Sequence, residues 1–147
     1  MSNDRAFCLG SDESVALRIL LADDFAIVRQ GLRTLLESHA GWTVVAEAED
    51  GEDALEKARE LLPDVVIADI GMPRMDGLEL TRRLRKVLPG TEVLVVTQHN
   101  SKQMMQELMK AGARGYVVKS SVGEDLISAV QAASEHREFV SRAVGAN

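Results

Sequence analysis

The sequence has 147 residues, of which 46% are hydrophobic and 27% charged, and its formal net charge is −6. This length predicts one domain with a core of its own, and this composition excludes wholesale disorder, collagen-like repeats and a coiled coil. The 23 acidic residues outnumber the 17 basic ones, so the chain lacks the positive field that favours a phosphate backbone, and we expect no direct nucleic-acid contact.

Residues 1–16 are rich in Ser, Asp, Asn and Gly without a periodic apolar pattern, so we expect a flexible N-terminal extension. The extension contains the single cysteine of the chain, Cys8, which excludes an intramolecular disulfide and fits a reducing compartment. No apolar run reaches the ~18 residues of a transmembrane helix, and the N-terminus lacks the apolar centre of a signal peptide. These features predict a cytoplasmic protein that does not bind membranes.

Five short apolar runs alternate with longer segments of helical periodicity in residues 17–136, which we predict to form the domain. This alternation is typical of βα units around a parallel sheet, whose right-handed crossovers place helices on both faces. The predicted fold is therefore an α/β three-layer sandwich with a five-stranded parallel sheet. Its strands are expected at Arg18 to Ala22, Trp42 to Glu47, Asp64 to Ala68, Glu92 to Val96 and Gly115 to Val118.

The helices are indicated by apolar residues at helical spacing and by capping residues at their starts. Asp50, Asp76 and Ser121 are expected as N-caps, and the last two are each followed by a glutamate three residues later. The fourth helix is expected at about Ser101 to Ala111. Residues 137–147 are expected to form a C-terminal tail or the start of a linker.

Polar residues follow four of the five predicted strands at their carboxyl ends. Asp23 and Asp24 follow the first strand, Asp69 the third, Thr97 the fourth and Lys119 the fifth. In an open parallel sheet, ligands bind at the carboxyl ends of the strands, near the point where the strand order reverses. These five residues are therefore candidates for one functional site.

The residue types at this edge indicate phosphoryl chemistry around a metal ion. Three converging carboxylates repel one another unless a cation lies among them, and Mg²⁺ suits such oxygen ligands together with a phosphate oxygen. Thr97 and Lys119 would contact the remaining phosphoryl oxygens. Asp69 follows a central strand alone, which makes it the candidate nucleophile for an aspartyl-phosphate. The plainer alternative is a solvated Asp23–Asp24 turn, with Asp24 as a cap of the first helix.

Four motifs in chain order strongly resemble the receiver domain of two-component response regulators. The resemblance extends over about Leu17 to Ala133 and implies a flavodoxin-like (βα)₅ fold with strand order 2-1-3-4-5. The motifs that carry it are LLADD (Leu20 to Asp24), VVIADIGMPRMDG (Val65 to Gly77), VLVVTQH (Val93 to His99) and GARGYVVKS (Gly112 to Ser120).

The resemblance implies a role for each acidic residue of the candidate site. Asp69 would accept a phosphoryl group from a sensor histidine kinase. Asp24 would bind Mg²⁺ directly, Asp23 would help through water, and Asp69 together with the backbone carbonyl of Gly71 would complete the metal ligands from the protein.

The resemblance also implies a switch. Lys119 would pair with one phosphoryl oxygen and Thr97 would bond another. Thr97 moves toward the phosphoryl group in such proteins, and an aromatic ring, here Tyr116, turns inward and reshapes the face made by the fourth helix, fifth strand and fifth helix. The protein would thus be a signalling switch with self-catalysed phosphoryl uptake and hydrolysis, and not a turnover enzyme.

Details of the motifs are similar to the LuxR-type (NarL/FixJ) subfamily, including the Thr-x-His of Thr97 to His99. Ser120 replaces the proline that often follows the lysine, so we expect a trans peptide bond after Lys119. LuxR-type regulators continue into a helix-turn-helix domain, whereas this sequence stops at Asn147. We therefore expect a truncated transcription regulator that reaches DNA only through that absent domain, with a possible phosphorylation-promoted homodimer.

Three alternatives stay open on the residues alone. A stand-alone receiver could act by protein–protein docking. A small phosphatase on the same fold usually needs a second acid two residues after its nucleophile, where this chain has Gly71. A flavin-binding carrier needs a hydroxyl- and glycine-rich phosphate loop after the first strand, where Asp23 and Asp24 would repel the phosphate.

Overall fold

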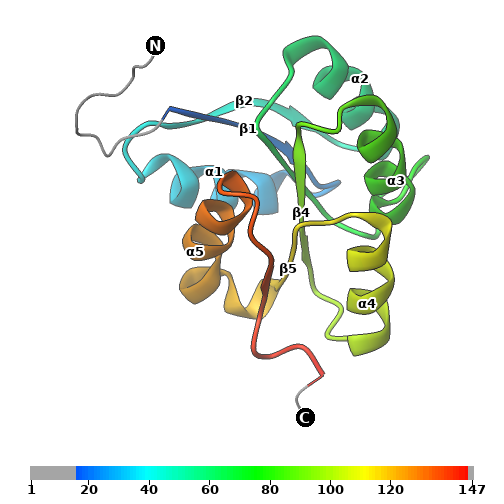
Figure 1. Cartoon of the computed structure of the whole chain (residues 1–147). Coiled ribbons are helices and arrows are strands. Elements are labelled where there is room, and N and C mark those ends of the chain that lie inside the picture. Colours follow the sequence, from blue (N-terminus) through cyan, green and yellow to red (C-terminus); the bar gives the residue numbers. More distant parts are fainter. Residues whose placement is uncertain (1–15, 146–147) are drawn as a thin grey trace.

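The computed structural model of the chain describes residues 16–145 (Figure 1). The predicted N-terminal extension, with Cys8, therefore lies outside the described residues apart from Ala16. The expected tail at residues 137–147 is described up to Gly145, and the domain boundary at residue 136 stays a prediction.

The sheet is parallel and has the order β2-β1-β3-β4-β5-β6. The five predicted strands and their order are confirmed, with ends that differ from the prediction by one residue at most. The prediction was wrong in leaving out a sixth strand, which pairs with the outer edge of β5. The strands are β1 (Leu17–Ala22), β2 (Trp42–Ala48), β3 (Val65–Ala68), β4 (Glu92–Thr97), β5 (Gly115–Val118) and β6 (Phe139–Val140).

The helices are α1 (Ala26–Glu37), α2 (Gly51–Leu61), α3 (Gly77–Val87), α4 (Lys102–Ala111) and α5 (Val122–Ser134), with a short 3₁₀ turn, η2 (Lys119–Ser121), before α5. No helix within residues 16–145 combines the length and the hydropathy needed to span a bilayer.

Side-chain caps start three of these helices, at Asp50 for α2, Asp76 for α3 and Ser101 for α4. Asp50 accepts a hydrogen bond from the Asp53 amide and Asp76 accepts one from the Glu79 amide, so both predicted caps are confirmed. Ser121 holds the N-cap position of α5, where the short turn η2 ends, but its side chain makes no capping bond, so the predicted capping role of that side chain is wrong.

The sheet is buried on both faces, as a doubly covered parallel sheet requires. Helices α2, α3 and α4 pack on one face, and α1 and α5 pack on the other. Side chains alternate between these two cores along each strand: Leu20 joins the first, and Ile19 and Leu21 join the second. The two cores hold the strands in register, which fixes the positions of the loops at their carboxyl ends.

Trp42, the single tryptophan of the chain, begins the edge strand β2 and is largely buried. Its ring stacks on His39, with 3.9 Å between ring centroids and an angle of 20° between the ring planes. This pair lies at the amino end of β2. The candidate site residues follow the opposite, carboxyl ends of the strands.

Candidate functional site

The predicted site residues stand at the carboxyl ends of four neighbouring strands. Asp23 and Asp24 follow β1, Asp69 follows β3, Thr97 ends β4 and Lys119 follows β5. The order β1-β3-β4-β5 places these ends side by side along one edge. Strand order reverses beside β1, which is where an open α/β sheet leaves a crevice for a ligand.

Three carboxylates meet at this edge. Asp23, Asp24 and Asp69 each offer an oxygen, and these oxygens lie within 4.8 Å of one another. Asp23 is only 2% exposed and Asp69 only 8%. Negative charges this close and this well shielded from water repel one another unless cations compensate them.

Lys119 supplies one compensating charge. Its Nζ donates to Oδ2 of Asp23 at 2.8 Å and to Oδ2 of Asp69 at 3.1 Å. Burial disfavours the charged form of Lys119, but the hydrogen bond to Asp23 and the negative charge of Asp69 outweigh it and raise its pKa above the usual value. The ammonium group therefore stays charged at neutral pH.

Asp24 keeps an uncompensated oxygen. Its Oδ1 is buried and has no hydrogen-bond partner within residues 16–145. The alternative in which Asp24 caps the first helix is wrong, because Phe25 is the N-cap of α1 and the Phe25 amide donates to Oδ1 of Asp23. A buried orphan carboxylate oxygen beside two other acids fits a hard divalent cation such as Mg²⁺.

Asp69 is held by the backbone that follows it. Its Oδ1 accepts a hydrogen bond from the Ile70 amide at 2.7 Å, and the Ile70 carbonyl accepts one from Gly77 at 2.9 Å. A Cβ at position 77 would collide with the backbone carbonyl of Asp69, so only glycine lets α3 start this close to the site. Gly71 is exposed in the same loop.

An ion pair that was not predicted from the sequence clamps the β3–α3 loop. Both Nε and Nη2 of Arg74 donate to Oδ2 of Asp50, at 3.0 and 2.7 Å. Arg74 has a φ of +65°, a left-handed conformation that costs a non-glycine residue about 1 kcal/mol. The Asp53 amide and then Arg74 lower the pKa of Asp50, so the clamp stays charged. The loop that carries Gly71 is thereby tied to the start of α2.

Thr97 and Tyr116 meet at the backbone of His99 and do not contact the carboxylates. Thr97 is fully buried, and its Oγ1 accepts a hydrogen bond from the His99 amide at 3.3 Å. Tyr116 is 0% exposed, and its hydroxyl donates to the His99 carbonyl at 2.6 Å. Burial raises the pKa of Tyr116, so this hydroxyl stays a donor. The ring is already turned inward.

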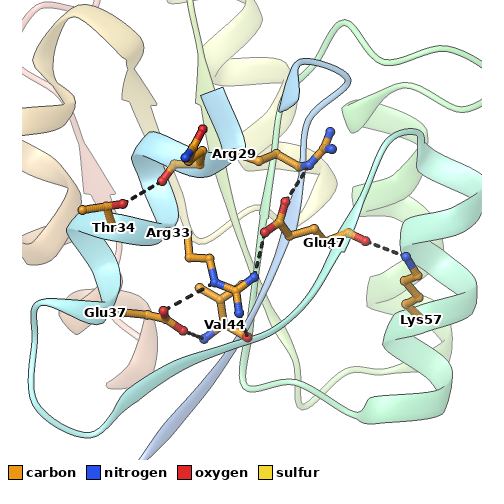
Figure 2. Close-up of polar contacts among 8 residues, drawn as sticks. Arg29, Arg33, Thr34, Glu37, Val44, Glu47 and Lys57 are labelled. Atoms are coloured by element: carbon orange, nitrogen blue, oxygen red, sulfur yellow. Dashed lines mark hydrogen bonds and ion pairs between the residues drawn. The ribbon is translucent and has the colours of Figure 1, made fainter. Parts of the chain in front are cut away.

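A network of ion pairs lies beside the site, on the β2 side of the sheet (Figure 2). Glu47 accepts from Arg29 at 2.8 Å and from Arg33 at 2.8 Å, and its carbonyl accepts from Lys57 at 2.6 Å. Burial opposes ionisation of Glu47, but the two arginines lower its pKa below the usual value. Arg29 also donates to the backbone carbonyl of Asp23 at 2.5 Å, which ties the network to the site.

Comparisons with known proteins agree with this geometry. The family model described as the response regulator receiver domain matches residues 19–131. An uncharacterized transcriptional regulatory protein of Bacillus subtilis, YxjL, is 36% identical over 118 residues, and the response regulator GacA of Pseudomonas aeruginosa is 38% identical over 125 residues. These alignments cover 80% and 85% of this chain but 54% and 58% of those two proteins, so the chain spans little more than half their length.

A solved structure is similar over most of the chain. It is a two-component response regulator of the LuxR family from Aurantimonas sp. SI85-9A1, with a TM-score of 0.85 and 38% sequence identity. The match covers 88% of this chain and 92% of that one.

Proposed function

The chain belongs to the response regulator receiver domains of two-component systems, in the LuxR-type subfamily, and we propose that it accepts a phosphoryl group from a histidine kinase on Asp69. The observation that carries the proposal is the position of the Lys119 ammonium between Asp23 and Asp69, beside the orphan oxygen of Asp24. This arrangement provides a carboxylate nucleophile, one fixed positive charge on Lys119, and oxygen ligands for a metal cation that would supply a second positive charge.

In the proposed transfer, a carboxylate oxygen of Asp69 attacks the phosphorus of a phosphohistidine. A P–O bond forms as the P–N bond breaks, and the leaving electron pair stays on the imidazole nitrogen, which takes a proton from solvent. Lys119 exchanges its bond to Asp69 for a bond to a phosphoryl oxygen. Phosphoryl transfer depends mainly on such positioning and charge neutralisation.

The donor set fits Mg²⁺. Asp23, Asp24 and Asp69 would hold the ion together with the backbone carbonyl of Gly71, and bound Mg²⁺ would neutralise charge on the phosphoryl oxygens. The Arg74–Asp50 ion pair supports this role because it restrains the loop in which Gly71 lies.

The proposed switch uses the two side chains that meet at His99. The Thr97 hydroxyl turns from the His99 amide to a phosphoryl oxygen, and Tyr116 stays inward through its bond to the His99 carbonyl. The signal is then read on the face formed by α4, β5 and α5.

The proposed partners are a sensor histidine kinase and a second copy of the chain. DNA would be reached only through an output domain beyond the matched region. This proposal fits the relative YxjL, which is described as a transcriptional regulatory protein. Acting beside a kinase, the protein would work in the cytoplasm.

The test is an intact-mass measurement with Mg²⁺ and acetyl phosphate. The wild-type chain is expected to gain one phosphoryl group, roughly 80 Da, and the gain should need Mg²⁺ and disappear in Asp69→Ala. Asp76→Ala is the matched control, because Asp76 caps α3 outside the cluster, and it should still gain the group. Absence of any gain in the wild-type chain, or equal gain in Asp69→Ala, would overturn the proposal.

A further inference from the structure

Residues 138–145, called here the C-terminal strap, run along the edge of the sheet between α4 and α5 (Figure 1). Strand β6 belongs to this strap. The Phe139 amide donates to the Arg114 carbonyl at 3.2 Å, and the Ser141 amide donates to the Tyr116 carbonyl at 2.9 Å. The strap therefore covers part of the α4-β5-α5 face with a segment of the chain itself.

Ser141 fastens the strap next to Lys119. It is 3% exposed, its Oγ donates to Oδ2 of Asp125 on α5 at 2.8 Å, and it accepts from the Val118 amide at 3.3 Å. Val118 immediately precedes the lysine that bridges Asp23 and Asp69. The strap therefore contacts the residue directly before Lys119.

The far end of the strap is fastened to Asn100, three residues after Thr97, in the loop between β4 and α4. The Gly145 amide donates to Oδ1 of Asn100 at 2.6 Å, and Val144 packs against the core cluster that contains Tyr116. Asn100 follows His99, whose carbonyl holds the Tyr116 hydroxyl. This contact therefore depends on the arrangement of the β4–α4 loop that the inward Tyr116 stabilises.

We propose that docking of the strap and phosphoryl uptake at Asp69 favour each other. The inference rests on the proposed function, in which uptake draws on Thr97 and Lys119 and favours the inward Tyr116. The strap binds Val118, directly before Lys119, and Asn100, in the loop that follows Thr97, and it binds them while Tyr116 is turned inward. Two events that favour the same arrangement are coupled, and the coupling acts equally in both directions. Phosphorylation thus tightens the strap, and the docked strap strengthens phosphoryl binding.

The first measurement is amide hydrogen exchange of the full chain with Mg²⁺, with and without beryllium fluoride as a phosphoryl mimic. Exchange of the Phe139 and Ser141 amides is expected to slow by about fivefold or more, the lower end of ordinary coupling between sites. Unchanged or faster exchange would overturn the proposal. No variant is needed, so folding defects cannot obscure the result.

The second measurement is the affinity for beryllium fluoride of Ser141→Asp against Ser134→Asp. Aspartate at 141 places a buried carboxylate against Asp125 and expels the strap, whereas Ser134 bonds only within its own helix and its variant carries the same added charge. Ser141→Asp is expected to bind about fivefold more weakly or worse, and Ser134→Asp to match the wild-type chain. Equal affinity of the two variants, or tighter binding by Ser141→Asp, would overturn the coupling.

Intact mass with acetyl phosphate, measured on the same samples, distinguishes a failure of the strap proposal from a failure of the proposed function. A wild-type chain that gains a phosphoryl group while its strap amides are unaffected overturns the strap proposal and leaves the proposed function standing. A wild-type chain that gains none overturns both.

Discussion

At the β2 edge of the sheet, long charged side chains from α1 and α2 converge on Glu47, whereas at the β6 edge the strap is fastened to β5, α5 and the β4–α4 loop by hydroxyl and amide groups. The first edge is held by charge-assisted bonds across three elements, which are roughly twice as strong as neutral ones. At the second edge, only the bond from Ser141 to the Asp125 carboxylate is charge-assisted, and the other two bonds join neutral groups. The site lies between them: Asp23 is tied to the charged network, and Lys119 adjoins the strap. The difference suggests one fixed half and one movable half.

The largest expected effect is a loss of stability in the fixed half, where α2 packs against the β3–α3 loop. A Cβ at Gly51 would collide with the backbone carbonyl of Met75, so Gly51→Ala should lower the free energy of unfolding by about 3 kcal/mol. Gly31→Ala is the matched control, because nothing surrounds that position in the exposed face of α1, and it should raise stability by about 0.5 kcal/mol. Urea denaturation followed by circular dichroism measures both, and equal effects would contradict the close packing at α2.

The next largest effect is expected when Glu47, at the centre of the ion-pair network, is replaced. Glu47→Ala leaves Arg29 and Arg33 without their shared carboxylate and should lower the free energy of unfolding by about 2 kcal/mol. The same substitution at Glu79, whose ion pairs with Arg82 and Arg83 are exposed, should have a much smaller effect. If urea denaturation gave the same loss for both glutamates, the β2 edge would not be the more strongly held one.

A pH-dependent effect tests the carboxylate of Glu92, which bonds the chain just before the strap. Glu92 is 3% exposed and bonds His136, just before the strap, as well as Arg114. Burial opposes its ionisation, but the bonds from His136 and Arg114 outweigh it and lower its pKa. A carboxylate with a lowered pKa stabilises the fold above the unfolded value of about 4.3, and this contribution is lost as the pH falls through the lowered value.

The check is Glu92→Gln, which should be less stable than the wild-type chain by about 1 kcal/mol at pH 7. That difference should shrink progressively below about pH 4.3. Glu135→Gln, on an exposed glutamate paired with Arg137, should show little difference at either pH. Urea midpoints that keep the same gap between wild type and Glu92→Gln down to low pH would contradict the assignment.

The smallest effect concerns two residues with a left-handed backbone conformation: Leu62, which follows α2, and His136, which lies just before the strap. Leu62 ends α2 at a φ of +51° and is exposed, so Leu62→Gly should raise the free energy of unfolding by about 0.5 kcal/mol. His136 has a φ of +62° but bonds Glu92, so His136→Gly should bring no gain. Thermal denaturation of the two variants measures the contrast, and a gain at both positions would show that the His136 bond contributes nothing.

The parts of the molecule that were predictable from the sequence depend on local signals. Apolar runs place the five main strands, and Asp23, Asp69 and Lys119 come together because each directly follows one of them. The caps Asp50 and Asp76 were predictable because a capping bond spans only three residues. The trans peptide bond expected after Lys119 is also present, since residues 16–145 contain no cis bond.

The missed parts depend on distant contacts. Strand β6 is two residues long and becomes a strand only through pairing with β5. Arg74 reaches Asp50 across 24 positions of sequence, and Arg33 reaches Glu47 across 14. Long side chains choose partners that the assembled fold brings near, and no spacing rule in the sequence encodes them. The left-handed φ of Arg74, a residue without special freedom there, was equally invisible.

The stacked pair of Trp42 and His39 gives the protein a built-in optical probe. Because the chain has one tryptophan, its tryptophan fluorescence comes from a single indole, at the amino end of β2. Phosphoryl chemistry at the carboxyl ends and motion of the strap at the opposite edge of the sheet should leave this emission nearly unchanged, whereas unfolding separates the rings. The emission therefore reports unfolding and does not respond to phosphorylation. With a second label on the strap, unfolding and strap motion can be followed in one sample.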